Sequence, residues 1–198
     1  MKIFLFLLLI LSVCANGQSI LPDKPKNSVS FGVNYLKLDA PDATGPHFQF
    51  AYTRFITAYK LAVSISSGYF ESNNRINIAN DYYVNSNFRR RITGDLTVAF
   101  TPIRTAKNLV TIGLGPSLWH RTDKTYQRID YTLTPDGEVT NLLVDGNYVK
   151  KIDAGFHAKA TYSHTVTRRL VASGQVALTR FKELSVIPMI GINIGYKL

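Results

Sequence analysis

Two histidines of this chain lie close in sequence to a serine, and that pairing could support hydrolysis. The chain has four histidines, His47, His120, His157 and His164. A serine hydroxyl next to a histidine base is the arrangement of an activated nucleophile. Adjacent strand residues point to opposite faces, so Ser163 and His164 cannot pair in a regular strand. Ser117 and His120 are better placed, although an interfacial histidine is the simpler interpretation.

Other catalytic patterns are absent from the sequence. No two histidines stand two or four residues apart, so we expect no metal site. There is no glycine-rich phosphate loop, carboxylate pair or nucleophile elbow. The sequence therefore predicts a non-enzymatic protein with no cofactor.

The C-terminal segment, residues 190–198, shows which elements would position these side chains. Even positions are large and apolar from Ile190 to Leu198, and odd positions are Gly191, Asn193, Gly195 and Lys197. This alternation predicts a strand with two unlike faces.

The N-terminus has the pattern of an export signal. Lys2 precedes the apolar run Ile3–Val13, and the small residues Ala15 and Gly17 follow it. We expect cleavage after Gly17, a signal peptide over residues 1–17 and a periplasmic leader over residues 18–27. An alternative is lipidation of Cys14, the one cysteine of the chain; after cleavage at Gly17 no thiol or disulfide would remain.

The chain is basic, with a formal net charge of +10 that falls to +9 when Lys2 is removed with the signal. An exported chain has little access to nucleic acid. The dispersed basic residues therefore favour a surface near anionic lipid headgroups.

Seven further segments alternate like the C-terminal one, and none is separated from the next by a helical pattern. Eight strands are therefore predicted, at about residues 29–35, 47–56, 61–70, 92–100, 110–119, 152–162, 170–179 and 190–198. Neighbouring strands joined in this way form an antiparallel meander, and eight can close into a barrel.

The connections predict which end of the barrel faces outward. The second, fourth and sixth are short, whereas residues 39–46, 71–90 and 121–147 form longer segments. We expect 71–90 to be a polar loop and 121–147, with Pro135-Asp136-Gly137, to be a hairpin extending two strands. Short turns at one end and long loops at the other are typical of outer-membrane barrels, whose long loops are extracellular. The predicted fold class is thus all-β, an eight-stranded antiparallel up-and-down transmembrane barrel over residues 28–198.

The alternation assigns residues to the two faces and to the interfaces. The face opposite the large apolar residues carries small residues rather than long charged ones. This suits a narrow lumen and argues against the alternative of a soluble, lipocalin-like barrel for an apolar ligand. Lipid-facing positions are Val29, Phe31, Val33, Phe48, Phe50, Leu61, Val63, Ile65, Leu96, Val98, Val110, Ile112, Leu114, Phe156, Val176, Leu178, Ile190, Ile192 and Ile194. Polar lumen positions are Asn34, Asp95, Asp153, His157, Lys159, Gln175 and Asn193. An aromatic girdle is expected from Tyr35, Tyr52, Tyr69, Phe100, Trp119, Tyr162 and Tyr196.

Six basic residues fall near the outer ends of the fourth and fifth predicted strands. They are Arg89, Arg90, Arg91, Arg121, Lys124 and Arg128. We expect them to form a patch for lipopolysaccharide phosphates, the alternative being a solvated rim.

The last strand resembles the assembly signal of bacterial outer-membrane proteins, with Tyr196 as the aromatic residue third from the end. Leu198 departs from the usual terminal phenylalanine. With the export signal, the chain resembles a small eight-stranded outer-membrane β-barrel. Its Asn- and Tyr-rich composition and its Gly-Gln junction are similar to the β-barrel families of Bacteroidetes.

This resemblance implies the bacterial cell outer membrane as location. It implies outer-membrane lipid, lipopolysaccharide and the barrel-assembly machinery as partners, and no nucleic acid. Such barrels have structural or surface-recognition roles and, rarely, modify lipid A, which is the alternative function here. We expect no pore, because eight strands leave no water channel.

Overall fold

The structure is a computed structural model that describes residues 27–38, 43–56, 60–79, 82–136, 138–182 and 185–198. The predicted signal peptide, its cleavage site and Cys14 lie outside these residues. So does the leader, except for Asn27. No helix in the described part of the chain is long and apolar enough to cross a membrane.

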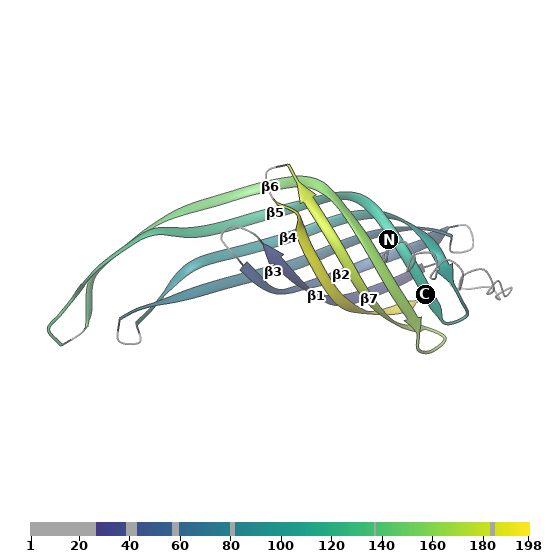
Figure 1. Ribbon diagram of the computed structural model, residues 1–198, viewed down its shortest axis with the longest axis horizontal. Coiled ribbons are helices and arrows are strands. Elements are labelled where there is room, and N and C mark those ends of the chain that lie inside the picture. Colours follow the sequence, from purple (N-terminus) through teal and green to yellow (C-terminus); the bar gives the residue numbers. More distant parts are fainter. Residues whose placement is uncertain (1–26, 39–42, 57–59, 80–81, 137, 183–184) are drawn as a thin grey trace, which may run out of the picture.

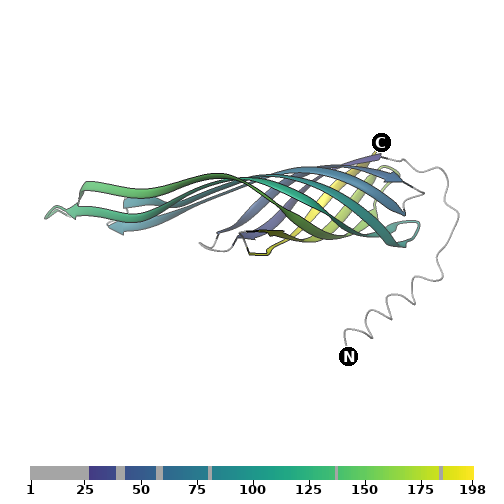
Figure 2. The same cartoon turned by 90° about the horizontal axis from the view of Figure 1, so that it is seen from above.

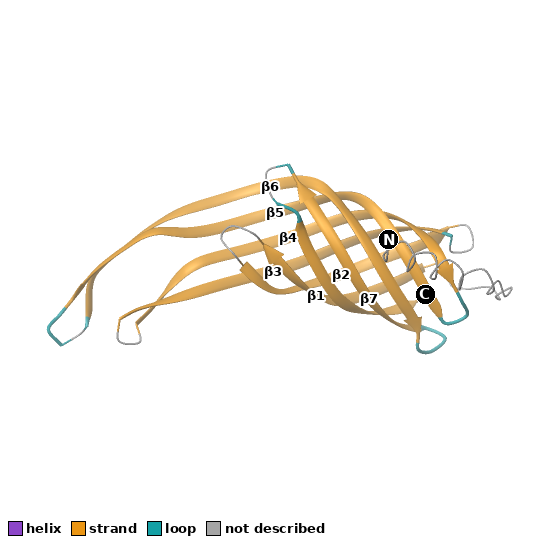
Figure 3. Ribbon diagram, in the orientation of Figure 1, coloured by secondary structure: helices purple, strands orange, loops and turns teal. Residues whose placement is uncertain are grey.

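The described residues form a closed antiparallel barrel in which each strand pairs with its neighbours in sequence and β8 pairs with β1 (Figures 1 and 3). The strands are β1 (Asn27–Leu38), β2 (Ala43–Ile56), β3 (Leu61–Ala79), β4 (Tyr82–Arg104), β5 (Asn108–Leu133), β6 (Val139–Thr165), β7 (Leu170–Phe181) and β8 (Ile187–Lys197). The predicted eight-stranded up-and-down barrel is confirmed.

The closing seam joins the C-terminal strand to the first strand. Phe31 lies opposite Ile194 on β8 and opposite Phe50 on β2, so apolar side chains of three strands share one outward row. Gly191 and Gly195 of β8 face inward, and at Gly191 a side chain would collide. A Cβ on Gly191 would lie 2.1 Å from Oδ1 of Asn34 on β1.

Four strands continue beyond the barrel as two long hairpins, β3–β4 and β5–β6 (Figures 1 and 2). We call this end of the barrel the hairpin end. The other, the turn end, holds the C-terminus, the start of β1 and the turns after β2, β4 and β6. The β5–β6 hairpin was predicted, with its turn closed by Thr134 N–H donating to the Glu138 carbonyl at 2.9 Å.

Two predicted loops are largely strand. Residues 71–90 are not a polar loop, because they pair across β3 and β4 from Glu71↔Arg90 to Ala79↔Tyr82, with two register shifts. Of the predicted loop 39–46, residues 43–46 belong to β2 and pair with β1. Cross-strand hydrogen bonds satisfy the backbone in both segments, although their asparagine, proline and glycine content disfavours strand.

Candidate functional site

The outer surface of the barrel is a continuous apolar band. The structure places all nineteen predicted lipid-facing residues on this surface, where Val29, Val63 and Val110 are half-buried and the others exposed. Ile192 and Phe156 are each 73 % exposed, so these large apolar side chains are not packed against the rest of the protein. An apolar surface of this extent marks contact with a partner or a membrane.

Aromatic residues bound this band at both ends, with one exception. Tyr35 and Tyr69 lie outward near the hairpin end, and Phe100, Tyr162 and Tyr196 lie outward near the turn end. The half-buried Tyr52 also faces outward, opposite Val29. The Tyr196 hydroxyl accepts a hydrogen bond from Arg169 at 2.8 Å. Leu198 is exposed, and its N–H donates to the carbonyl of Asn27 at 2.9 Å.

The exception is Trp119, and its predicted place in the girdle is wrong. Trp119 is only 1 % exposed and points into the barrel, where its ring packs edge-on against Phe181 with centroids 5.0 Å apart. It has the same parity as Gly113, Gly115 and Ser117 along β5, which all face the lumen. Counting that alternation to the end of the strand would have placed it correctly.

Trp119 belongs to an apolar plug that fills the lumen at the hairpin end. The plug consists of Leu36, Leu38, Ala43, Phe70, Trp119, Phe181 and Ile187, with Met189 packed against it. Side chains of β1, β2, β3, β5, β7 and β8 contribute. The plug fills this end of the barrel interior with buried apolar side chains, an arrangement that strand alternation does not predict.

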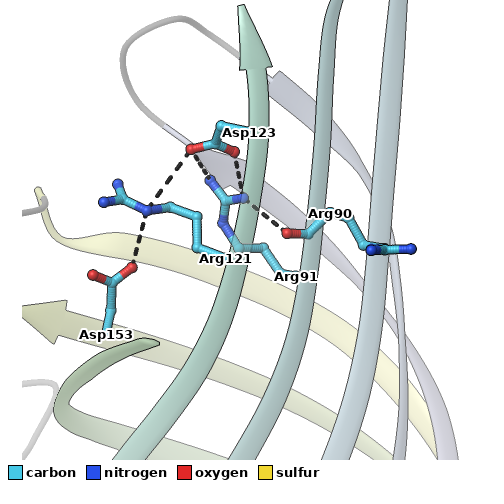
Figure 4. Close-up of polar contacts among 5 residues, drawn as sticks. All are labelled: Arg90, Arg91, Arg121, Asp123 and Asp153. Atoms are coloured by element: carbon cyan, nitrogen blue, oxygen red, sulfur yellow. Dashed lines mark hydrogen bonds and ion pairs between the residues drawn. The ribbon is translucent and has the colours of Figure 1, made fainter. Parts of the chain in front are cut away.

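An ion-pair cluster lies beside the plug, between β4, β5 and β6 (Figure 4). The Arg91 guanidinium donates two hydrogen bonds to the Asp123 carboxylate, at 2.6 and 3.2 Å. Arg121 Nε lies 3.1 Å from Asp153 and 3.8 Å from Asp123. Arg91 is 2 % exposed, so its charge depends on this pairing. Two arginines and two carboxylates are thereby mutually neutralised.

The predicted basic patch for lipopolysaccharide is therefore wrong in its composition. Arg89, Arg91 and Arg121 are inward or largely buried, and Arg128 pairs with Asp130 at 2.7 Å. Strand alternation separates the three consecutive arginines: Arg90 points away from the cluster that holds Arg91 (Figure 4). Of the predicted residues, Arg90 and Lys124 remain on the outer face.

The structure adds Lys150 to this outer face. Arg90 on β4 and Lys150 on β6 both pair with Thr122 of β5. Lys124 lies two residues further along β5, toward the hairpin tip. This row, Arg90, Lys124 and Lys150, comes directly after the rung that contains Tyr69, Ile92, His120 and Ile152. Lys150 was missed because it lies in a segment treated only as a hairpin.

Below the plug, the centre of the lumen holds a polar network that includes most predicted lumen residues. Gln175 donates to Asn34 at 2.5 Å and to Gln49 at 2.9 Å, and Gln49 donates to Ser66 at 3.1 Å. Ser66 and Ser117 donate to the Asp95 carboxylate. His47 Nε2 lies 3.0 Å from the Thr93 hydroxyl. Such mutual bonding satisfies polar groups that water does not reach.

His157 has the neighbours of a catalytic histidine but not the geometry. Its Nε2 lies 2.8 Å from the Thr97 hydroxyl, and its Nδ1 lies 4.0 Å from Asp95. The second distance is too long for a hydrogen bond, so His157 lacks the carboxylate contact that orients the base of a catalytic triad. This trio is part of the polar network.

Neither Ser/His pair from the sequence comes together. Ser163 faces the lumen and accepts a hydrogen bond from Ser173, whereas His164 faces outward and contacts Asn108 at 2.8 Å. Ser117 is buried on Asp95, and His120 is on the opposite face of β5. Within the described residues, no group of three or more potential ligands could hold a metal ion.

The remaining predicted lumen residues, Lys159 and Asn193, line a cavity of about 150 Å³. It extends from the turn end, beside residues 104–108, to Gln49 and Gln175 of the polar network. The lumen is thus open at the turn end and filled at the hairpin end.

Comparison with known proteins rests on structure alone, because no family model and no curated protein matches the sequence. The attachment invasion locus protein Ail of Yersinia pestis is 9 % identical, with a TM-score of 0.55 over 88 % of this chain and 99 % of that one. Neisserial surface protein A is 10 % identical, with a TM-score of 0.56 over 87 % and 97 %. This is the fold of the small outer-membrane β-barrels.

The same fold relates the chain to OprG from Pseudomonas aeruginosa, at 9 % identity and a TM-score of 0.53 over 91 % of this chain and 100 % of OprG. At such low sequence identity, these structural matches establish the outer-membrane barrel fold alone. Function has to be inferred from the site itself.

Proposed function

We propose that this protein is a non-enzymatic integral outer-membrane barrel that presents its two hairpins at the cell surface for a structural or recognition role. The apolar band around a closed barrel carries the proposal. A closed barrel satisfies its backbone hydrogen bonds internally, and side chains as exposed as Ile192 and Phe156 are stable in lipid rather than in water.

The hairpins supply the recognition surface. They expose aromatic and aliphatic side chains far from the barrel, including Tyr83, Tyr131, Leu143 and Tyr148. From Gly155 toward the hairpin tip, no strand among the described residues pairs with the outer edge of β6, because its pairing with β7 ends at Gly155. Exposed rings and a free strand edge are features of protein-binding surfaces.

The outer basic row, Arg90, Lys124 and Lys150, would contact lipopolysaccharide phosphates. It follows the rung of Tyr69 and Ile92, where the apolar band ends, which is the depth of anionic headgroups. The comparison with Ail, crystallised with a sulfated heparin analogue, extends the proposal to surface attachment.

Export and lineage are part of the same proposal. The segment 1–17 would be removed after Gly17, so that N-terminal sequencing of the membrane protein would begin at Gln18. The composition and the Gly-Gln junction support a Bacteroidetes-type barrel.

Site-directed cysteine labelling tests the orientation. The mature chain would have no cysteine, so Asp136→Cys at the β5–β6 tip and Ala106→Cys in the β4–β5 turn each give one thiol. In intact cells an impermeant maleimide should label the first variant and reach the second only after permeabilisation. Labelling of Ala106→Cys alone in intact cells, or recovery of the chain in the soluble periplasmic fraction, would refute the proposal.

A further inference from the structure

The cavity at the turn end is lined by basic groups. Arg104, Lys107, Lys159 and Lys197 line it, and no acidic side chain in the described part of the chain does. The remainder of the wall is mainly small residues, hydroxyls and amides, among them Ser64, Thr97, Thr111, Thr161, Ser173 and Asn193. The cavity therefore combines positive charge with many hydrogen-bond donors.

Lys159 is the deepest of the four basic residues. It extends inward from the middle of β6, opposite Gly113 on one side and Ala177 on the other. Within the described residues it makes no hydrogen bond or ion pair; the carboxylate of Asp95, in the polar network, interacts with it only through space. Asp95 also accepts hydrogen bonds from Ser66 and Ser117, so its charge is shared.

The other basic groups lie closer to the opening. Lys197, near the C-terminus, donates to the Thr165 hydroxyl at 3.0 Å, and Lys107 lies in the β4–β5 turn. Three lysines near one shared carboxylate leave an excess of positive charge in a narrow, low-dielectric well. Such a well concentrates anions.

We propose that this cavity is a binding site for a phosphate-type oxyanion, free or as a small monoester, which enters from the turn end. Lys159 supplies the charge at the base of the site, and the hydroxyls and amides of the wall donate to the remaining oxygens. Lysine acts as a point charge for phosphate, and charged acceptors make the stronger hydrogen bonds. The apolar plug prevents passage, so the anion is held rather than conducted.

Titration calorimetry on the folded protein in an uncharged detergent tests this site with inorganic phosphate as the probe. We expect one phosphate per chain with a dissociation constant on the order of 1 mM. Lys159→Met keeps the aliphatic stem and should weaken binding at least about tenfold. Lys182→Met, at an exposed lysine directly after β7, is the matched control and should leave binding unchanged.

A second variant keeps the test independent of how Lys159→Met folds. Thr161→Glu adds a carboxylate to the wall beside the lysines and should abolish phosphate binding. The proposal is overturned if the wild-type protein binds no phosphate, or if both cavity variants bind as the wild type does.

Glycerol phosphate, as a second probe, distinguishes a phosphate monoester from free phosphate as the ligand of this cavity. Tighter binding than inorganic phosphate, lost in Lys159→Met, would assign the site to a monoester. Weaker binding with the same dependence would assign it to the free anion, and binding unaffected by Lys159→Met would overturn the site.

Discussion

Asp123 illustrates how individual residues close the hairpin end of the lumen. Its carboxylate is shared between Arg91 and Arg121, which come from neighbouring strands and lie opposite each other. Removing one partner from a buried pair costs more than the pair itself contributes, because the remaining charge stays desolvated. Asp123 therefore acts as the countercharge that allows two arginines to enter the barrel.

We predict that Asp123→Ala lowers the free energy of unfolding by about 3 kcal/mol, because Arg91 would be left buried without a countercharge. Urea titration in liposomes, read from the shift of folded and unfolded bands on gels, measures the change. Asp130→Ala is the control: its pair with Arg128 is exposed at 45 % and 74 %, so a loss below about 1 kcal/mol is expected. Equal losses would contradict a buried role for Asp123.

Trp119, the one tryptophan of the chain, reports directly on its own placement. A ring in the plug should emit at short wavelength and resist quenching by brominated lipids and by aqueous iodide alike, since neither quencher enters packed protein. Steady-state fluorescence in liposomes is the measurement. Strong quenching by brominated lipid would return Trp119 to the interface, where the sequence analysis had placed it.

At the scale of elements, strand alternation predicts most of the barrel. Small and large residues alternate through every barrel strand, so the number of strands, their order and their outward residues follow from the sequence. The same alternation also gives the direction of Arg89 and Arg91. They alternate in step with Thr93 and Asp95, and all four side chains face inward. Three consecutive arginines of one strand point to alternating faces and therefore do not form one patch.

The β3–β4 hairpin could not be predicted in the same way. Its residues 71–90 include six asparagines, and their apolar alternation is short and interrupted, as at Ile76/Ile78 and Tyr82/Val84. Its strands are maintained by pairing with each other and, as far as Asn87↔Thr125, with β5. Extension of an existing sheet is a tertiary effect that overrides weak local propensity.

The distal β5–β6 hairpin should be dispensable for folding. Deleting residues 126–146 and joining Thr125 to Asn147 through Asn-Gly keeps the paired ends and the ion-pair cluster. We expect this variant to remain folded, with a heat-dependent shift in gel migration, and to lose the surface site at Asp136. Deleting residues 121–151 instead removes Arg121 and Asp123 and should destabilise the barrel. Failure of both deletions to fold would show that the hairpin is part of the folding unit.

For the whole molecule, the interior is arranged in layers along the barrel axis. The ion-pair cluster and the apolar plug occupy the hairpin end, the polar network lies in the middle, and the cationic cavity opens at the turn end. The sequence predicts small residues inside but not this order, because the order depends on which rungs of different strands lie level. Register is fixed by the closed sheet as a whole.

The layering predicts a barrel that is closed to ions and can be opened at one place. Wild-type protein in planar bilayers should show no conductance steps, because Trp119 and Phe181 pack across the lumen at the hairpin end. Trp119→Ala combined with Phe181→Ala removes the two rings whose centroids are 5.0 Å apart and should produce small steps. Phe100→Ala combined with Phe156→Ala is the matched control, because both of those rings are on the outer surface, and it should stay silent. Conductance steps of the same size in the wild type and in the plug variant would show that water and ions already pass the plug. In that case the cavity at the turn end would be the entrance to a pore, whereas a silent wild type leaves it a closed site for a bound anion.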